Sequence, residues 1–123
     1  MNLRIKNALI SVSDKENISS LLKIFKKYNI SIISSGGTYK YIKKHGYDCT
    51  ELSQYTGFKE MLDGRVKTLH PKIHAGILHD RHNKDHKYQM SKQKFPPIDL
   101  IVVNFYPFQK VVKETNNSKN IIE

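Results

Sequence analysis

The stretch "ALISVSDKENISSLLKIFKKYNISIISSGGT", residues 8–38, decides the fold of this chain. It opens with a short, mostly apolar run that stops at a polar turn, as a buried strand does. Residues 18–30 then carry apolar side chains at three- and four-residue steps, among them Ile18 and Leu22, which predicts a helix with one apolar face. A second strand is expected at residues 31–34. Strand, helix and strand in this order predict a βαβ unit with parallel strands.

The middle of the chain continues this alternation. We expect a helix over residues 39–45, with Thr38 as its N-cap and Gly46 just past its end. A third strand is expected over residues 47–52. Residues 53–70 are predicted to be loop, with one helical turn near Glu60.

Pro71 is placed to begin a helix that reaches Leu78, because proline suits the first turn. The charged segment at residues 79–97 is predicted to be an exposed, partly helical excursion. Residues 98–108, "IDLIVVNFYPF", include a run that is apolar at successive positions. Such a run is typical of a central strand of a parallel sheet, and the chain is therefore predicted to be an α/β domain.

Size and composition restrict the class of protein. The chain has 123 residues, enough for one domain, and 38% of them are hydrophobic. Its net charge of +10 favours an anionic partner, but the 18 lysines are dispersed and there are only three arginines. Arginine is the more usual reader of base edges, so we do not expect a dedicated nucleic-acid binder. The single cysteine, Cys49, is interpreted as a half-buried strand residue; a cytoplasmic location is expected, and no apolar run is long enough for a membrane span.

Polar segments follow three of the predicted strands: "SVSDK", "SSGGT" and "NFYPF". In a parallel sheet the carboxyl ends of the strands meet at one edge, where ligands bind. The two glycines would let the backbone approach an anion, and the amides of the next helical turn would point at it. Ser35 and Thr38 add hydroxyls, while Ser11, Ser13 and Lys15 could serve the same phosphate. The alternative for "SSGGT" alone is a plain strand–helix turn with a threonine cap.

The segment "GRVKTLH" places Arg65, Lys67 and Thr68 within four residues of one another. Their fork, point charge and hydroxyl suit a planar ligand rich in carbonyl and amide groups. A solvated basic turn is the alternative interpretation of this segment taken alone.

Two histidine pairs have the four-residue spacing that can share a metal ion on one helical face: His70 with His74, and His82 with His86. Neither pair has the nearby glutamate of a helical zinc hydrolase, and Pro71 moves His70 off the helix. We therefore expect no metal site. The second pair is interpreted as surface histidines, and the first as packing or pocket-lining residues.

Four segments carry a family resemblance: "ALISVSDKENI", "ISSGGTYKYI", "TGFKEMLDGRVKTLHPKIHAGILHDR" and "IDLIVVNFYPF". They occur in this order across nearly the whole chain. They closely resemble the N-terminal part of the bifunctional purine-biosynthesis enzymes that carry IMP cyclohydrolase and AICAR transformylase activities. The resemblance implies a three-layer, methylglyoxal-synthase-like α/β domain with a mostly parallel central sheet, incomplete at its C-terminus, and cytoplasmic.

The reaction implied by the resemblance is closure of the purine ring of 5-formamido-imidazole-4-carboxamide ribonucleotide (FAICAR) to give IMP, with loss of water. The family's phosphate and ribose contacts correspond to Ser13, Asp14, Lys15, Ser35, Gly36, Gly37 and Thr38. Its base contacts correspond to Arg65, Val66, Lys67, Thr68, Val103 and Asn104. Its active-site lysine and tyrosine correspond to Lys67 and Tyr106.

The resemblance also implies partners and co-substrates. The cyclohydrolase step needs no metal or redox cofactor, whereas the transformylase half, absent from this chain, uses 10-formyltetrahydrofolate. The complete enzymes are homodimers. Phe105 and Lys59 stand where the family usually has Leu and Pro. In the family, a further catalytic aspartate and lysine lie beyond the position of Glu123, so the chain is expected to be a fragment that lacks normal cyclohydrolase activity.

Two other functions fit the same fold. A methylglyoxal synthase would need a carboxylate base, for which Asp14 and Asp99 are the strand-end candidates. A non-catalytic nucleotide-binding regulatory domain would bind the phosphate without turnover.

Overall fold

The computed structural model describes residues 4–13, 15, 17–64 and 66–104. Its centre is a parallel sheet of β1 (Asn7–Ser11), β2 (Ser31–Ser34), β3 (Thr50–Glu51) and β4 (Leu100–Val103), in the order β3-β2-β1-β4. Every pair of neighbouring strands is parallel, so the carboxyl ends of all four lie at one edge. The predicted parallel α/β architecture is confirmed.

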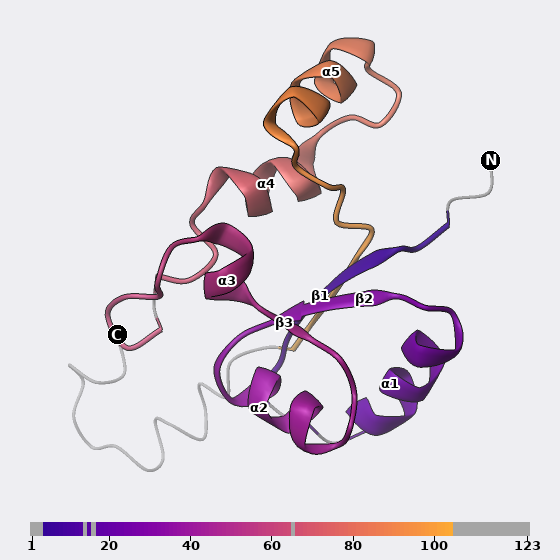
Figure 1. Ribbon diagram of the computed structural model, residues 1–123, viewed down its shortest axis with the longest axis vertical. Coiled ribbons are helices and arrows are strands. Elements are labelled where there is room, and N and C mark those ends of the chain that lie inside the picture. Colours follow the sequence, from indigo (N-terminus) through magenta and orange to yellow (C-terminus); the bar gives the residue numbers. More distant parts are fainter. Residues whose placement is uncertain (1–3, 14, 16, 65, 105–123) are drawn as a thin grey trace.

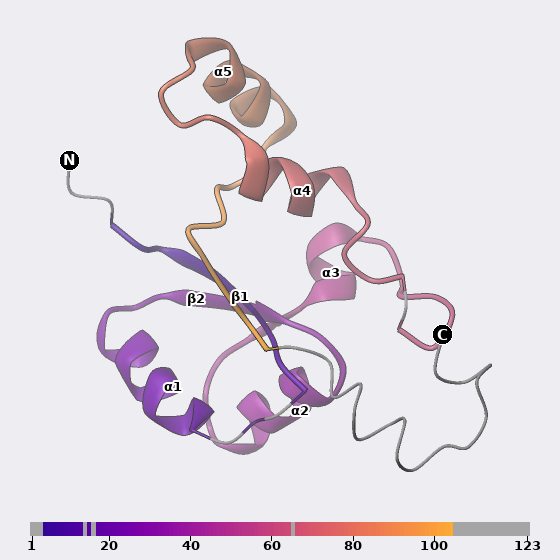
Figure 2. The same ribbon diagram turned by 180° about the vertical axis from the view of Figure 1, so that it is seen from behind.

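Helices cover both faces of this sheet (Figure 1). The described helices are α1 (Ile18–Lys27), α2 (Gly36–Lys44), α3 (Leu52–Thr56), α4 (Pro71–Leu78) and α5 (Lys84–Gln93). Helices α1 and α2 lie on one face, and α3 and α4 lie on the other. Figure 2 shows from behind that α5 lies beyond α4, away from the sheet.

Two apolar clusters hold the layers together. On one face, Ala8, Ile10 and Ile32 of the strands pack with α1 and with Ile42 of α2. On the other face, strand residues pack with α3, α4 and Ile98, which precedes β4. Because successive strand residues point to opposite faces, the short buried run of β1 supplies both clusters.

The position of β4 differs from the prediction. Within the described sheet β4 pairs with β1 alone and lies at an edge, although a central place was expected. Its residues alternate between half-buried and exposed, with Ile101 40% and Val103 63% exposed. The run of apolar residues at successive positions therefore wrongly predicted that both faces of β4 would be equally buried.

The start of α2 also differs from the prediction. The helix begins at Gly36, three residues earlier than expected, and its N-cap is Ser35 with φ −142°. Gly36 has φ +55°, a conformation that costs glycine little. Thr38 lies inside the first turn and not at the N-cap, and its hydroxyl bonds to Val12, just after β1, and not to its own helix. The end of the helix is as predicted, with Gly46 at φ +83° just after the C-cap His45.

The segment between β3 and α4 contains more structure than predicted. Leu52 to Thr56 form the short α3, with Leu52 buried in the core. No helical turn forms at Glu60; instead Met61 and Val66 exchange backbone hydrogen bonds of 2.9 and 3.1 Å. Helix α4 has the predicted bounds, with Pro71 in its first turn and the side chain of His70 accepting a hydrogen bond from the Lys72 amide.

The excursion that contains α5 is fixed back onto the sheet by Arg81. Its guanidinium donates to the carboxylate of Asp99 at 2.6 Å and to the Ile98 carbonyl at 2.9 Å. Asp99 also accepts the backbone amides of Lys6 and Asn7, at 2.8 and 3.0 Å. Asp99 thus lies at the amino end of β4, and its prediction as a strand-end acid at the ligand edge is wrong. No helix in the part of the chain described here is long and apolar enough to cross a membrane.

Candidate functional site

Two hydroxyls join the carboxyl ends of β1 and β2. Thr38, only 4% exposed, donates to the Val12 carbonyl at 3.0 Å and accepts from the Val12 amide at 3.4 Å. Ser34, fully buried, donates to the Ile10 carbonyl at 2.6 Å. These bonds hold the first turn of α2 beside the segment that follows β1.

Lys15 places a positive charge at that junction. Its ammonium donates to the carbonyls of Val12 and Ser13, at 3.2 and 3.4 Å. A Cβ atom added to Gly37 would lie 3.6 Å from both Cε and Nζ of Lys15, so the lysine lies against the start of α2. An ammonium has three donors, and two carbonyls leave one for a ligand. The positive end of the helix and this charge together favour an anion.

The end of β4 reaches the same place through Asn104. Its side-chain oxygen accepts the Ser13 amide at 2.8 Å, and Val103 pairs with Ser11 in the strand register. Residues from the ends of β1, β2 and β4 therefore meet along one line, the strand-end rim. We define the strand-end rim as Ser11, Ser13, Lys15, Ser35, Gly36, Gly37, Thr38, Val103 and Asn104.

The other predicted residues are not joined to the rim. The loop between α3 and α4 carries Val66, Lys67 and Thr68. It lies on the same side of the sheet as the C-terminal end of β2 (Figure 1). The Lys67 ammonium is 4.0 Å from Glu60, and none of the hydrogen bonds or ion pairs among described residues connects it to the rim. The remaining predicted site residues, Asp14, Arg65 and Tyr106, lie outside the described residues.

Backbone strain is concentrated in the loop that carries Lys67. Leu62 and Asp63 have φ of +55° and +57°, and Gly64 follows at +83°. A Cβ at Gly64 would lie 3.1 Å from the Lys67 ammonium, so glycine is the residue that leaves room for this side chain. Consecutive left-handed residues are costly and cluster at functional segments. The sequence signalled the turn only through its Asp-Gly pair.

One histidine of each predicted pair has a structural partner. His70 caps α4, as described, and His86 accepts the Asp80 amide at 2.9 Å. In each case the ring nitrogen that accepts is unprotonated. Over the residues that the structure describes, no group of three or more histidine, cysteine, aspartate or glutamate side chains is placed to hold a metal ion.

Burial affects the pKa values of Cys49 and Asp99, which both lie away from the rim. It raises the pKa of the Cys49 thiol to about 11, against a smaller opposing effect of Lys43. Cys49 is half-buried as predicted, but it precedes β3 and does not lie within it. Burial alone would raise the pKa of Asp99, but the hydrogen bonds from Arg81 and two backbone amides, with the guanidinium charge, lower it below the ordinary value.

Comparison with known proteins gives consistent relatives. The chain is 49% identical over 118 residues to the "Bifunctional purine biosynthesis protein PurH" of Clostridium perfringens strain SM101, covering 96% of this chain and 24% of that protein. The protein of the same name from Clostridium acetobutylicum is 50% identical over 119 residues, with coverage of 97% and 24%. The chain thus spans about a quarter of the length of these curated relatives.

A solved structure and a family model agree with this result. The crystal structure of ForH superimposes with a TM-score of 0.74 at 30% identity, over 84% of this chain and 54% of that one. The family model described as "MGS-like domain" matches residues 17–123. The chain therefore belongs to the family of MGS-like domains.

Proposed function

We propose that this chain belongs to the cyclohydrolase part of a bifunctional purine-biosynthesis enzyme, which in its complete form closes the ring of FAICAR to give IMP. The observation that carries the proposal is the anion site at the strand-end rim, where Lys15 lies against Gly37 at the start of α2. The purine-biosynthesis names of the curated relatives support a purine nucleotide as the ligand.

In this proposal the rim binds the 5′-phosphate of the nucleotide. A phosphate monoester carries close to two negative charges near neutrality, which suits one ammonium, helix amides and hydroxyls. Ser13 and Ser35 supply hydroxyls, and Gly36 and Gly37 supply approachable amides. The hydroxyl of Thr38 is engaged with Val12, so Thr38 acts by holding the α2 turn in place.

Ring closure requires the carboxamide nitrogen to attack the formyl carbon, after which water leaves. An amide nitrogen is a poor nucleophile, so positioning supplies much of the acceleration. Negative charge builds on the formyl oxygen, and donors aimed at that oxygen lower the barrier. We assign this electrostatic role to Lys67 and an orienting or proton-relaying role to Tyr106. The condensation changes no oxidation state, so the proposal includes no redox cofactor. It also assigns no step to a metal ion.

For the complete protein, we propose a cytoplasmic homodimer that also formylates AICAR with 10-formyltetrahydrofolate. The base-side contacts would come from Arg65, Val66, Thr68, Val103 and Asn104, with Asp14 beside the phosphate. Nucleic acid and membrane are not part of this proposal.

The test measures FAICAR closure and nucleotide binding separately. In a full-length version, Lys67→Met and Tyr106→Phe are expected to abolish closure while IMP binding persists. Lys15→Met is expected to weaken IMP about tenfold, the loss of one charged hydrogen bond, and to leave inosine, which has no phosphate, unchanged. The 123-residue chain alone is expected to bind IMP weakly without normal turnover. Full closure by the Lys67 variant, or equal losses of IMP and inosine in the Lys15 variant, would refute the assignment.

Methylglyoxal synthase is the alternative enzyme. Of its two candidate bases, Asp99 is paired with Arg81 at the amino end of β4, away from the rim. Asp14 lies outside the described residues. If purine monophosphates raise the melting temperature and triose phosphates do not, the synthase is excluded. If the full-length protein binds IMP but never turns FAICAR over, the regulatory module replaces our proposal.

A further inference from the structure

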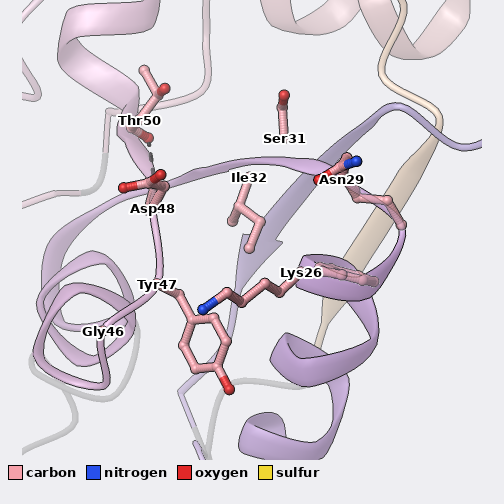
Figure 3. Close-up of a pocket in the computed structure, with 11 residues that line it drawn as sticks. Lys26, Asn29, Ser31, Ile32, Gly46, Tyr47, Asp48 and Thr50 are labelled. Carbon is pink, nitrogen blue, oxygen red and sulfur yellow. Dashed lines mark hydrogen bonds between the residues drawn. The ribbon is translucent and has the colours of Figure 1, made fainter.

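A cavity lies at the opposite edge of the sheet from the strand-end rim. It has a volume of about 360 Å³ and is formed where β2 and β3 begin and where α1 and α2 end (Figure 3). Its lining includes Ser31 at the start of β2 and residues 46–50, which connect α2 to β3. Neither the fold nor the proposed ring closure uses this cavity.

One side of the cavity is apolar and partly aromatic. Phe25 and Ile32, 2% and 6% exposed, lie behind it, and the half-buried ring of Tyr47 faces the side chain of Lys26 (Figure 3). A cavity of about 150 Å³ is enough to hold benzene. The space is therefore ample for one aromatic ring that carries a polar substituent, lying against Tyr47 and Ile32.

The polar side of the cavity is cationic. The ammonium of Lys26 lies 5.9 Å from the centre of the Tyr47 ring, at the outer limit of a cation–π contact. Among the described residues, none of the carboxylates is within ion-pair distance of Lys26. Figure 3 shows the Asp48 carboxylate directed away from Lys26. The Cys49 thiol is neutral near pH 7, since burial raises its pKa to about 11.

The charges at the C-terminal ends of α1 and α2 determine which ligand charge the cavity favours. The last turns of α1 and α2 carry Lys26, Lys27, Lys43 and Lys44, and neither helix contains an acidic residue. The negative ends of both helix dipoles face the same region, which disfavours a compact dianion such as phosphate. A monoanion is repelled less than a dianion by these helix ends, and it can pair with the single ammonium of Lys26 beside Tyr47.

We propose that this cavity binds a monocyclic aromatic carboxylate, with its ring against Tyr47 and its carboxylate on Lys26. The site is separate from the strand-end rim and does not depend on the function proposed for the rim.

Nicotinate and nicotinamide are suitable probes, because they share a ring and differ in charge. Titration of the ¹⁵N-labelled chain with nicotinate is expected to shift the amides of residues 31–32 and 46–50, with a Kd of about 1 mM for so small a ligand. Nicotinamide is expected to bind at least about fivefold more weakly. Raising the salt concentration should weaken nicotinate only.

Lys26→Met is the decisive variant, since Lys26 is exposed and methionine has a similar helix propensity. It should weaken nicotinate about fivefold, the value of a favourable exposed ion pair. The matched control is Lys23→Met, one turn earlier on α1 and outside the cavity lining; it should leave Kd unchanged. Tyr47→Leu should weaken both probes. Equal binding of the two probes, an unchanged Kd in Lys26→Met, or no shifts at about 10 mM nicotinate would each overturn the proposal.

Discussion

Replacement of Gly76 by alanine sets two effects of opposite sign against each other. Gly76 lies within α4, where alanine is intrinsically better by about 1 kcal/mol. An added Cβ, however, would lie 3.0 and 3.1 Å from the Cγ1 and Cδ1 atoms of Ile98 and 3.2 Å from the Pro96 carbonyl. The Gly76 carbonyl also accepts the Ile98 amide at 3.0 Å, which fixes the two segments together.

The structure indicates which effect wins. Ile98 is 4% exposed and packed in the core, and the Pro96 carbonyl is part of the backbone. Neither neighbour can therefore move without displacing the segment that leads into β4. Overpacking of this kind costs about 1–3 kcal/mol. After subtraction of the propensity gain, we expect Gly76→Ala to destabilise the chain by about 1 kcal/mol, with a fall in Tm of about 4 °C.

Urea unfolding of a double-mutant cycle tests this reasoning. Ile98→Ala removes both side-chain atoms that the new Cβ would meet, at a cost of about 2–5 kcal/mol. In that background Gly76→Ala should become neutral or stabilising, giving a coupling of about 1 kcal/mol or more. If Gly76→Ala raises the urea midpoint of the otherwise unchanged chain, steric crowding does not dominate and the reasoning is refuted.

Three further predictions concern single side chains. Asp99→Asn should destabilise the chain above pH about 4, because it breaks the ion pair with Arg81. Folding lowers the pKa of Asp99, so the ion pair stabilises the fold above the pKa that Asp99 has in the unfolded chain. This stabilisation is lost as the pH falls through the lower pKa of the folded chain. The difference between the urea midpoints of the two proteins should therefore be smaller at pH 3 than at pH 7. Tyr55→Phe should be neutral or stabilising by about 1 kcal/mol, since the buried Tyr55 hydroxyl has no hydrogen-bond partner among the described residues; a clear loss of Tm would reveal one. Thr38→Val should cost about 1–3 kcal/mol, because the Val12 amide loses the Thr38 oxygen as acceptor and the Val12 carbonyl keeps only the Lys15 ammonium as donor. Thr38→Ser should recover most of this loss; equal losses would mean that packing, not the hydroxyl, matters.

Local pattern was sufficient for most of the fold. The three- and four-residue spacing gave α1, proline and leucine marked the ends of α4, and Gly46 marked the end of α2. These signals are local, because they depend on helix geometry and on backbone conformations that few residues adopt. The position of β4 at the edge of the described sheet could not be predicted from local pattern, because a run of apolar residues does not reveal how many strands flank it.

The candidate site was predictable only in part, for a related reason. The convergence of "SVSDK" and "SSGGT" follows from parallel strands, and Lys15 indeed lies against Gly37. The role of Thr38 was missed because its partner, Val12, is 26 residues away and no local pattern reveals a hydrogen bond between α2 and the segment after β1. The same holds for Asp99, whose partners Arg81 and Lys6 become neighbours only through folding.

The bond between Ser13 and Asn104 spans 91 positions of the chain. During synthesis the segment after β1 emerges early, but its amide must wait for nearly all the described residues before its acceptor exists. Closing so long a loop is entropically costly and is repaid only when β4 docks against β1. The strand-end rim should therefore be complete only after β4 has emerged from the ribosome and docked, well after α1 and α2 have been synthesised.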